Sequence, residues 1–414
     1  MLIRSRIVYP VSRPPVENGA IVVHDGRVVA LGRFEDLRAQ HCGEVIDVGD
    51  SILLPGLVNA HCHLDYTAMA RLISPPSGFT DWVNQLIGIK ASWSYTEYAE
   101  SWIRGLHQQI DCGTTTLADI EAVPELLPDV LAIAPIRVMS FREMITVRSR
   151  ANPAQIVATH IQELEHLPHG RHTVGLSPHA PYSTSQELVQ VTAAMSRGKG
   201  WRWTMHVAES TDETEMFVHA RGSMFDWLKG QRDMNDCGNG TPVRWLAETG
   251  ALGPELLMVH ANCLATGEPD LLGRHGVHVV HCPRSHDYFS HPAFRYDSLK
   301  RAGVNICLGT DSLVSVRAPR GTVPVLDLFA EMQAFQAAHP AIGPGEILSL
   351  ATRAGAAALG LAGEVGELSP GSAADLITLP FSAPLSSAVE AIVGHSGSVG
   401  SSMVAGQWIR RSGF

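Results

Sequence analysis

The feature of this chain that most constrains its fold is a long alternation of strand-like and helix-like stretches between residues 57 and 339. Short runs rich in valine, isoleucine and leucine predict strands, and longer stretches with apolar residues three or four positions apart predict helices. The eight strand-like runs are 57–61, 115–119, 136–141, 173–177, 203–207, 256–260, 277–282 and 305–309. The helical candidates include 96–110, 152–167, 185–195, 212–220 and 325–339. Eight such units predict an α/β fold, a (β/α)8 TIM barrel of about 250 residues, although an open doubly wound sheet shows the same alternation.

The two ends of the chain share a different sequence pattern, in which short strand-like runs follow one another. Apolar runs at 20–24 and 28–31 flank Asp25-Gly26, a dipeptide that favours a tight hairpin turn. Further short strands are expected at 45–48, 374–379, 389–393 and 403–409. We therefore predict a small β-sandwich formed jointly by residues 1–55 and 365–414, with the barrel in residues 56–364 between them.

Composition excludes several classes of protein. The 414 residues are 45% hydrophobic and 17% charged, as in a globular chain with a buried core. No apolar run approaches the length of a membrane helix, about 20 residues. The net charge is −10 and the lysines and arginines are scattered, so we expect no nucleic-acid partner. The seven cysteines form no C-x-x-C pair and the N-terminus lacks a secretory leader pattern, which favours free thiols and a cytoplasmic location.

Polar side chains gather where the predicted barrel strands end. His61 and His63 are two residues apart, so both imidazoles lie on the same side of one strand. His206 lies at the end of the fifth strand, and Asp311 follows the eighth. Three imidazoles and a carboxylate suit one borderline divalent ion, Zn²⁺ or else Fe²⁺, and leave a position open for water. A single histidine at a strand end is more often structural, so the prediction depends on the joint placement of all four residues.

Two more residues at these strand ends suit catalysis. Glu209 follows His206 by three residues and could carry protons beside a metal-bound water, as could Asp311. Glu209 could also simply cap the helix that begins after Ser210. His260 ends the sixth strand, where it could hydrogen-bond the attacking water or the substrate, or only pack behind the site.

Six segments resemble the signature blocks of the amidohydrolase superfamily, in its mononuclear deaminase and chlorohydrolase branch. They are PGLVNAHCHL at 55–64, SPHAPY at 177–182, HVAE at 206–209, HCPRS at 281–285, LGTDS at 308–312 and LSPGSAADL at 368–376. The resemblance implies a distorted (β/α)8 barrel with a β-sandwich, and one zinc or iron ion held by the four ligands named above. Binuclear relatives usually bridge two metals with a carboxylated lysine on the fourth strand, and residues 173–182 contain no lysine. A single metal ion is therefore expected.

The resemblance also implies roles for individual side chains. The residue matching Glu209 is the proton shuttle, and the one matching His260 orients the hydrolytic water or polarises the target. The residue matching His179 contacts the substrate. Ser315, four residues beyond Asp311, is a further candidate substrate contact.

The segment GFTDWVNQLI at 78–87 resembles the aromatic loop of deaminases that act on adenine nucleosides, such as aminodeoxyfutalosine deaminases. Trp82 in this segment could stack on a base, or it could anchor an amphipathic helix. Methylthioadenosine and S-adenosylhomocysteine deaminases tend to carry an acid near the position of Lys90, where it meets ribose hydroxyls. This departure counts against a simple ribose contact. Lys90, Arg142 or Arg148 could instead meet a substrate carboxylate, or be solvated surface cations.

Three functions remain open at this point. The leading one is a metal-dependent hydrolytic deaminase of an amino-substituted heterocycle, most directly an adenine-type nucleoside. The second keeps the metal site but hydrolyses a cyclic amide, a guanidine or a halogenated triazine, and the third is a catalytically silent binding scaffold. The expected partners are a small-molecule substrate and a second copy of the chain in a homodimer, with neither nucleic acid nor membrane.

Overall fold

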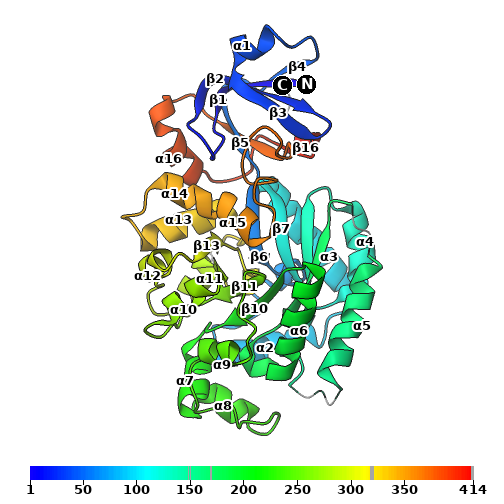
Figure 1. The fold of residues 1–414 in the computed structure, drawn as a ribbon, viewed down its shortest axis with the longest axis vertical. Helices are drawn as coiled ribbons and strands as arrows, with labels where there is room; N and C mark the ends of the chain where they lie inside the picture. The colour runs from blue at the N-terminus through cyan, green and yellow to red at the C-terminus, as the bar shows by residue number, and fades with distance from the viewer. Residues whose placement is uncertain (148, 150, 168–169, 318–320, 412–414) are drawn as a thin grey trace.

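The larger part of the molecule is a nearly closed barrel (Figure 1). The computed structural model describes residues 1–147, 149, 151–167, 170–317 and 321–411. Eight parallel strands lie side by side in chain order: β6 Leu57–Cys62, β7 Thr114–Glu121, β8 Arg137–Met144, β9 Thr173–Pro178, β10 Trp203–Val207, β11 Leu256–His260, β12 His278–His281 and β13 Asn305–Leu308. A parallel bridge between Cys62 and Asp311 joins the first strand to the segment after the last. The prediction of a (β/α)8 barrel is confirmed.

Helices surround this sheet (Figure 1). They are α2 Phe79–Lys90, α3 Tyr95–Asp111, α4 Leu127–Ile133, α5 Pro153–Glu165, α6 Gln186–Lys199, α7 Thr211–His219, α8 Ser223–Leu228, α9 Pro242–Glu248, α10 Glu268–Arg274, α11 Pro283–Phe289, α12 Tyr296–Arg301, α13 Leu328–Ala338, α14 Pro344–Leu350 and α15 Arg353–Ala358. Their starts follow from the sequence, because Ser94, Asn152 and Ser185 accept backbone hydrogen bonds as N-caps of α3, α5 and α6. Within the described part of the chain, no helix is long and apolar enough to cross a membrane.

The inside of the barrel is filled by alternate residues of the strands. Val58 and Ala60 of β6, Met139 and Phe141 of β8 and their counterparts on other strands form one buried cluster. Gly175 on β9 makes room for this packing, because a Cβ atom there would lie 2.5 Å from the ring of Phe141. On β8 and β10 this alternation continues to the carboxyl end, whereas β6 has a register irregularity between Asn59 and Cys62 and β11 ends in a left-handed residue, His260.

The two ends of the chain combine into a second, mixed sheet. Its strands follow the order β16-β15-β14-β5-β1-β2-β3, and β4 pairs with β1. The bounds are β1 Leu2–Val8, β2 Val16–His24, β3 Arg27–Arg33, β4 Val45–Asp47, β5 Ser51–Pro55, β14 Leu376–Pro380, β15 Ser401–Val404 and β16 Gln407–Arg411, with a short helix α1 at Phe34–Arg38. Nε of Arg137 on β8 lies 2.6 Å from Oδ2 of the buried Asp375, which ties the barrel to this sheet. The predicted joint β-structure is present, while the residue limits of the two domains stay a prediction.

Three details of the terminal segments differ from the sequence prediction. Residues 389–393 were expected as a strand, and this prediction is wrong: they belong to helix α16, Ala388–Val393. So short an apolar run cannot distinguish the two structures, and the packing of α16 against α13 and α14 favours the helix. The run 403–409 is split into β15 and β16 by a turn with positive φ at Ala405 and Gly406. Strands β1 and β5 were not predicted.

Candidate metal centre and active site

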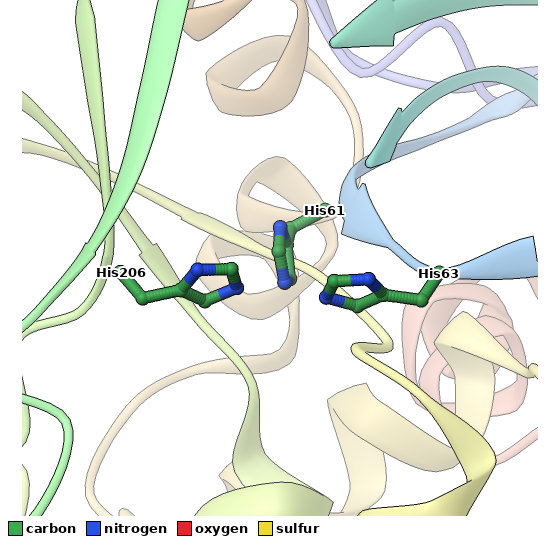
Figure 2. Close-up of side chains that lie close together, drawn as sticks. All are labelled: His61, His63 and His206. Atoms are coloured by element: carbon green, nitrogen blue, oxygen red, sulfur yellow. The ribbon is translucent and has the colours of Figure 1, made fainter. Parts of the chain in front are cut away.

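Three of the four predicted metal ligands lie together at the open end of the barrel. His61 and His63 come from the end of β6 and His206 from β10, and their rings point toward one another (Figure 2). One ligand atom from each lies within 4.8 Å of the other two, and all three side chains are buried. Their arrangement follows from strand geometry, because the period of two directs His61 and His63 to the same side of β6.

Asp311 approaches two of these histidines. Its Oδ1 atom lies 3.6 Å from Nε2 of His61 and 3.7 Å from Nε2 of His63. These separations are longer than hydrogen bonds and leave space between the carboxylate and the imidazoles. The backbone N–H of Asp311 donates to the carbonyl of His61 at 3.1 Å, so the last strand end is held against the first.

The hydrogen-bond pattern fits a cation at this cluster. Both ring nitrogens of His61 and Nδ1 of His63 are buried without a hydrogen-bond partner among the described residues. Nδ1 of His206 lies 2.9 Å from the carbonyl of His179, which leaves Nε2 free to act as a ligand. Burial lowers the pKa of His63 to about 3, so its imidazole is neutral and can bind a metal. Imidazole nitrogens with one carboxylate are ligands typical of zinc.

Glu209 and His260 form a second, adjoining pair. Oε1 of Glu209 lies 3.4 Å from Nε2 of His260, and both side chains are almost fully buried. Burial, with the neighbouring Asp311 and Glu213, raises the pKa of Glu209 well above its usual value. Burial lowers the pKa of His260 to about 3. A carboxyl with a raised pKa beside a neutral imidazole suits proton transfer.

Left-handed backbone turns aim these residues into the site. His260 has a φ of 75° and Asp311 a φ of 52°, and Ala208, directly before Glu209, has a φ of 52°. Such φ values are unfavourable for residues with side chains and are found mainly where the surrounding structure enforces them. Beside Ala208, two hydrogen bonds hold the backbone of Glu209: its N–H donates to Glu213 at 2.8 Å, and its carbonyl accepts from Asn262 at 3.0 Å.

A cavity of about 400 Å³ opens above the cluster, within the size range of small-molecule sites. His179, Trp82 and Lys90 line it together with His63, His206, Glu209, His260 and Asp311. The indole of Trp82 donates to the carbonyl of Val314 at 3.1 Å and packs near Phe79, with 5.7 Å between the ring centroids. Trp82 is therefore both a buried anchor and part of the cavity wall, and its stacking on a base stays a prediction.

The structure places the other predicted substrate contacts differently. Ser315 is fully buried and does not line the cavity; its hydroxyl donates to Oδ2 of Asp311, a predicted ligand, at 3.1 Å. Arg142 does not line the cavity either. Its guanidinium lies 3.5 Å from the carbonyl of Ala122, because the alternation of β8 turns position 142 away from the barrel interior. Arg148 lies outside the described residues.

Sequence reasoning missed Glu143, a buried residue that lines the cavity. The predicted strand ended at residue 141, whereas β8 continues to Met144. Had the strand been extended, its period of two would have placed Glu143 on the same side as Phe141, facing the interior. Tyr66, which also lines the cavity, lies in a short 3-10 helix after the ligands of β6 and carries no sequence signal for this role.

Comparison with known proteins agrees with this geometry. A model of the amidohydrolase family matches residues 52–409, and a bacterial imidazolonepropionase-like composite domain matches residues 19–41. A 5-methylthioadenosine/S-adenosylhomocysteine deaminase of Syntrophobacter fumaroxidans is 30% identical over 381 residues, which cover 88% of this chain and 81% of the relative.

Solved structures with low sequence identity share the fold. An adenosine deaminase from Xanthomonas campestris with bound zinc has a TM-score of 0.86 at 22% identity, over 99% of this chain and 92% of the other. An aminofutalosine deaminase of Helicobacter pylori in complex with methylthio-coformycin has a TM-score of 0.85 at 19% identity, over 99% of both chains. The resemblance expected from the six motifs is confirmed. Since the family model spans most of its length, this chain belongs to the amidohydrolase family.

Proposed function

We propose that the chain is a metal-dependent hydrolase that releases ammonia from an amino-substituted heterocycle, most directly an adenine-type nucleoside. The observation that carries this proposal is the buried Glu209–His260 pair beside the three-histidine cluster. The relative and the two structural neighbours described above are all named as deaminases, which supports the reaction class.

In this proposal each side chain has a distinct task. Glu209, whose pKa is raised by burial, donates a proton to a ring nitrogen and makes the adjacent carbon more electrophilic. Burial opposes ionisation of Asp311, but the surrounding histidines hold its pKa well below the usual value, so it can accept a proton from the attacking water. Neutral His260 hydrogen-bonds the reacting groups. The amine leaves as ammonia after accepting a proton, and the ring carbon keeps the oxygen of the water.

His61, His63, His206 and Asp311 would hold the metal ion, for which we propose Zn²⁺ with Fe²⁺ as the alternative. A divalent ion bound there supplies a Lewis acid that lowers the pKa of water to about 7. Metal analysis of the purified protein distinguishes the two ions. One ion per chain is expected, since the described residues contain a single cluster of this kind.

Ammonia release from adenosine, guanine, cytosine and aminotriazines tests the proposed reaction. We expect release by the zinc-loaded protein and a loss of about 100- to 10,000-fold in Glu209→Gln. Glu215→Gln is a matched control, because Glu215 is a half-exposed acid on α7, the helix that begins just after Glu209, and it pairs with Arg221. Product masses that show cleavage of a ring amide or a carbon–halogen bond without ammonia would favour the second function. A protein that binds no metal would favour the scaffold.

Assembly and location stay predictions. We propose a homodimer, which size-exclusion chromatography with light scattering tests. We also propose a cytoplasmic location, in line with the seven free cysteines. Cell fractionation tests this second proposal.

A further inference from the structure

Glu143 places a carboxylate in the wall of the active-site cavity. It lies on β8, two residues beyond Phe141 and four beyond Met139, both of which fill the barrel interior. The alternation of the strand therefore directs Glu143 inward at the open end of the barrel. Its residue exposure is only 7%.

The carboxylate of Glu143 accepts no hydrogen bond from the described residues. Its nearest nitrogen neighbours are Nζ of Lys90 at 3.8 Å and Nε2 of His179 at 4.0 Å, both beyond hydrogen-bonding distance. A buried carboxylate without donors is costly, whereas hydrogen bonds to it are strong. The cavity thus presents an acceptor that a ligand can satisfy.

The charges around Glu143 favour a neutral ligand over a cationic or anionic one. Lys90 lies beside the carboxylate, and its ammonium group also hydrogen-bonds the Tyr66 hydroxyl and lies 4.6 Å from the centroid of that ring. The pair has no net charge, so an ammonium ligand gains little. Because Lys90 already has three contacts, a substrate carboxylate is also a poor partner for it.

His179 provides a second acceptor beside Glu143. Its Nδ1 lies 2.7 Å from the hydroxyl of Ser183, and that hydroxyl donates to the carbonyl of Ala180 at 3.2 Å. This network assigns the His179 proton to Nδ1, so Nε2 faces Oε1 of Glu143 as an acceptor. Two acceptors 4.0 Å apart fit a neutral ligand that carries two adjacent donors, and a pair of vicinal hydroxyls is such a ligand. The His179 ring also lies 5.0 Å from that of His206, so this position is one imidazole away from the metal cluster.

We propose that Glu143 determines specificity by accepting hydrogen bonds from the vicinal hydroxyls of a ribose-type sugar, with His179 as the second acceptor and Lys90 as the neutralising partner. This inference rests on the proposed deaminase function and narrows its substrate from aminated heterocycles in general to nucleosides. It also gives the sugar a contact on β8, although the position near Lys90 lacks the acid that related deaminases use.

Kinetics with and without the sugar hydroxyls test the inference. Adenosine is compared with 2′,3′-dideoxyadenosine on zinc-loaded wild-type protein, Glu143→Gln and Glu143→Asp. The wild type should prefer adenosine in kcat/KM by about 10- to 100-fold, and both variants should lose most of this preference because they act poorly on adenosine while dideoxyadenosine is little affected. Glu121→Gln is the matched control: it removes a buried carboxylate from the neighbouring strand β7 that does not line the cavity, and the preference should survive. An equal loss on both substrates, or no preference in the wild type, would overturn the inference.

Binding of the products separates this inference from the proposed function. Inosine and 2′,3′-dideoxyinosine are not consumed, so calorimetry can measure their Kd on the zinc-loaded protein. If the wild type releases no ammonia from adenosine but binds inosine at least 10-fold more tightly than dideoxyinosine, and Glu143→Gln abolishes the difference, the sugar site stands and the proposed reaction fails. If ammonia is released and neither probe pair distinguishes the wild type from Glu143→Gln, the reaction stands and the sugar site fails.

Discussion

Replacement of Asn59 by alanine should loosen the metal centre without touching a ligand. Asn59 is fully buried on β6, two residues before His61. Its Nδ2 donates to the hydroxyl of Thr310 at 2.8 Å, and its Oδ1 accepts from the Thr310 N–H at 3.1 Å. Thr310 directly precedes Asp311, so this side chain closes the barrel between the strand that carries two histidines and the segment that carries the carboxylate.

The size of the effect follows from the groups left without a partner. A buried hydrogen bond contributes about 1 kcal/mol net, and a buried donor left unpaired costs about 1 to 3 kcal/mol. Asn59→Ala removes two short bonds to Thr310, so we expect the free energy of unfolding to fall by about 2 to 5 kcal/mol. Loss of such a supporting bond typically weakens metal binding by about 10- to 100-fold.

Urea unfolding measures the first effect, and zinc titration against a chromophoric chelator measures the second. Asn305→Ala is the matched control: Asn305 lies at the other end of β13, where its Nδ2 donates to the carbonyl of Ala354 at 2.9 Å. That variant should lose stability but keep its zinc affinity. If Asn59→Ala and Asn305→Ala lower zinc affinity equally, or if neither does, then Asn59 does not position the metal centre.

Two further predictions follow from side chains near and far from the site. Ser315→Ala removes the hydrogen bond to Asp311 and should weaken zinc binding about 10-fold in the same chelator assay. The preference for adenosine over dideoxyadenosine should stay unchanged. An altered preference with normal zinc affinity would instead support Ser315 as a substrate contact. Burial, and to a smaller extent Arg202, lowers the pKa of His278 to about 4, so its imidazole is neutral in the folded protein above that pH. In the unfolded chain the same imidazole takes up a proton below about pH 6.5. The free energy of unfolding should therefore fall as the pH drops from 6.5 toward 4. Over this range the free energy of unfolding of His278→Gln, measured with urea, should fall by about 2 to 3 kcal/mol less than that of the wild type. An identical pH dependence of the two proteins would contradict the lowered pKa.

The barrel could be predicted because each of its strands carries its own signal. Each barrel strand is mostly buried and carries a short apolar run bounded by polar or turn-forming residues, so local sequence is sufficient to locate it. Pro55-Gly56 marks the boundary between β5 and β6, whereas β5 itself, Ser51–Pro55, was not predicted because its short apolar run leads directly into β6. The chain passes from one sheet to the other at Gly56, where tertiary packing requires glycine: a Cβ atom there would lie 2.0 Å from the hydroxyl of Thr115 on the neighbouring strand β7.

In the candidate site, too, some features follow from local sequence and others depend on the folded chain. The convergence of His61, His63 and His206 was predictable because residues at the carboxyl ends of parallel strands meet at one end of a barrel, while their role as metal ligands stays a prediction. Glu143 was not, because its inward direction depends on where β8 ends. The role of Ser315 depends on its distance from Asp311, which only the folded chain provides.

The mixed sheet has a consequence for biosynthesis. Strand β5 lies between β1 and β14, so its neighbours come from opposite ends of the chain. During translation β5 must wait, with one row of amides and carbonyls unpaired, until about 320 more residues have left the ribosome. Proteins cut short before residue 376 would keep that row open, and an open strand edge invites pairing with another chain. Strand β14, which begins at Leu376, thus covers the open edge of a strand that is made early in translation.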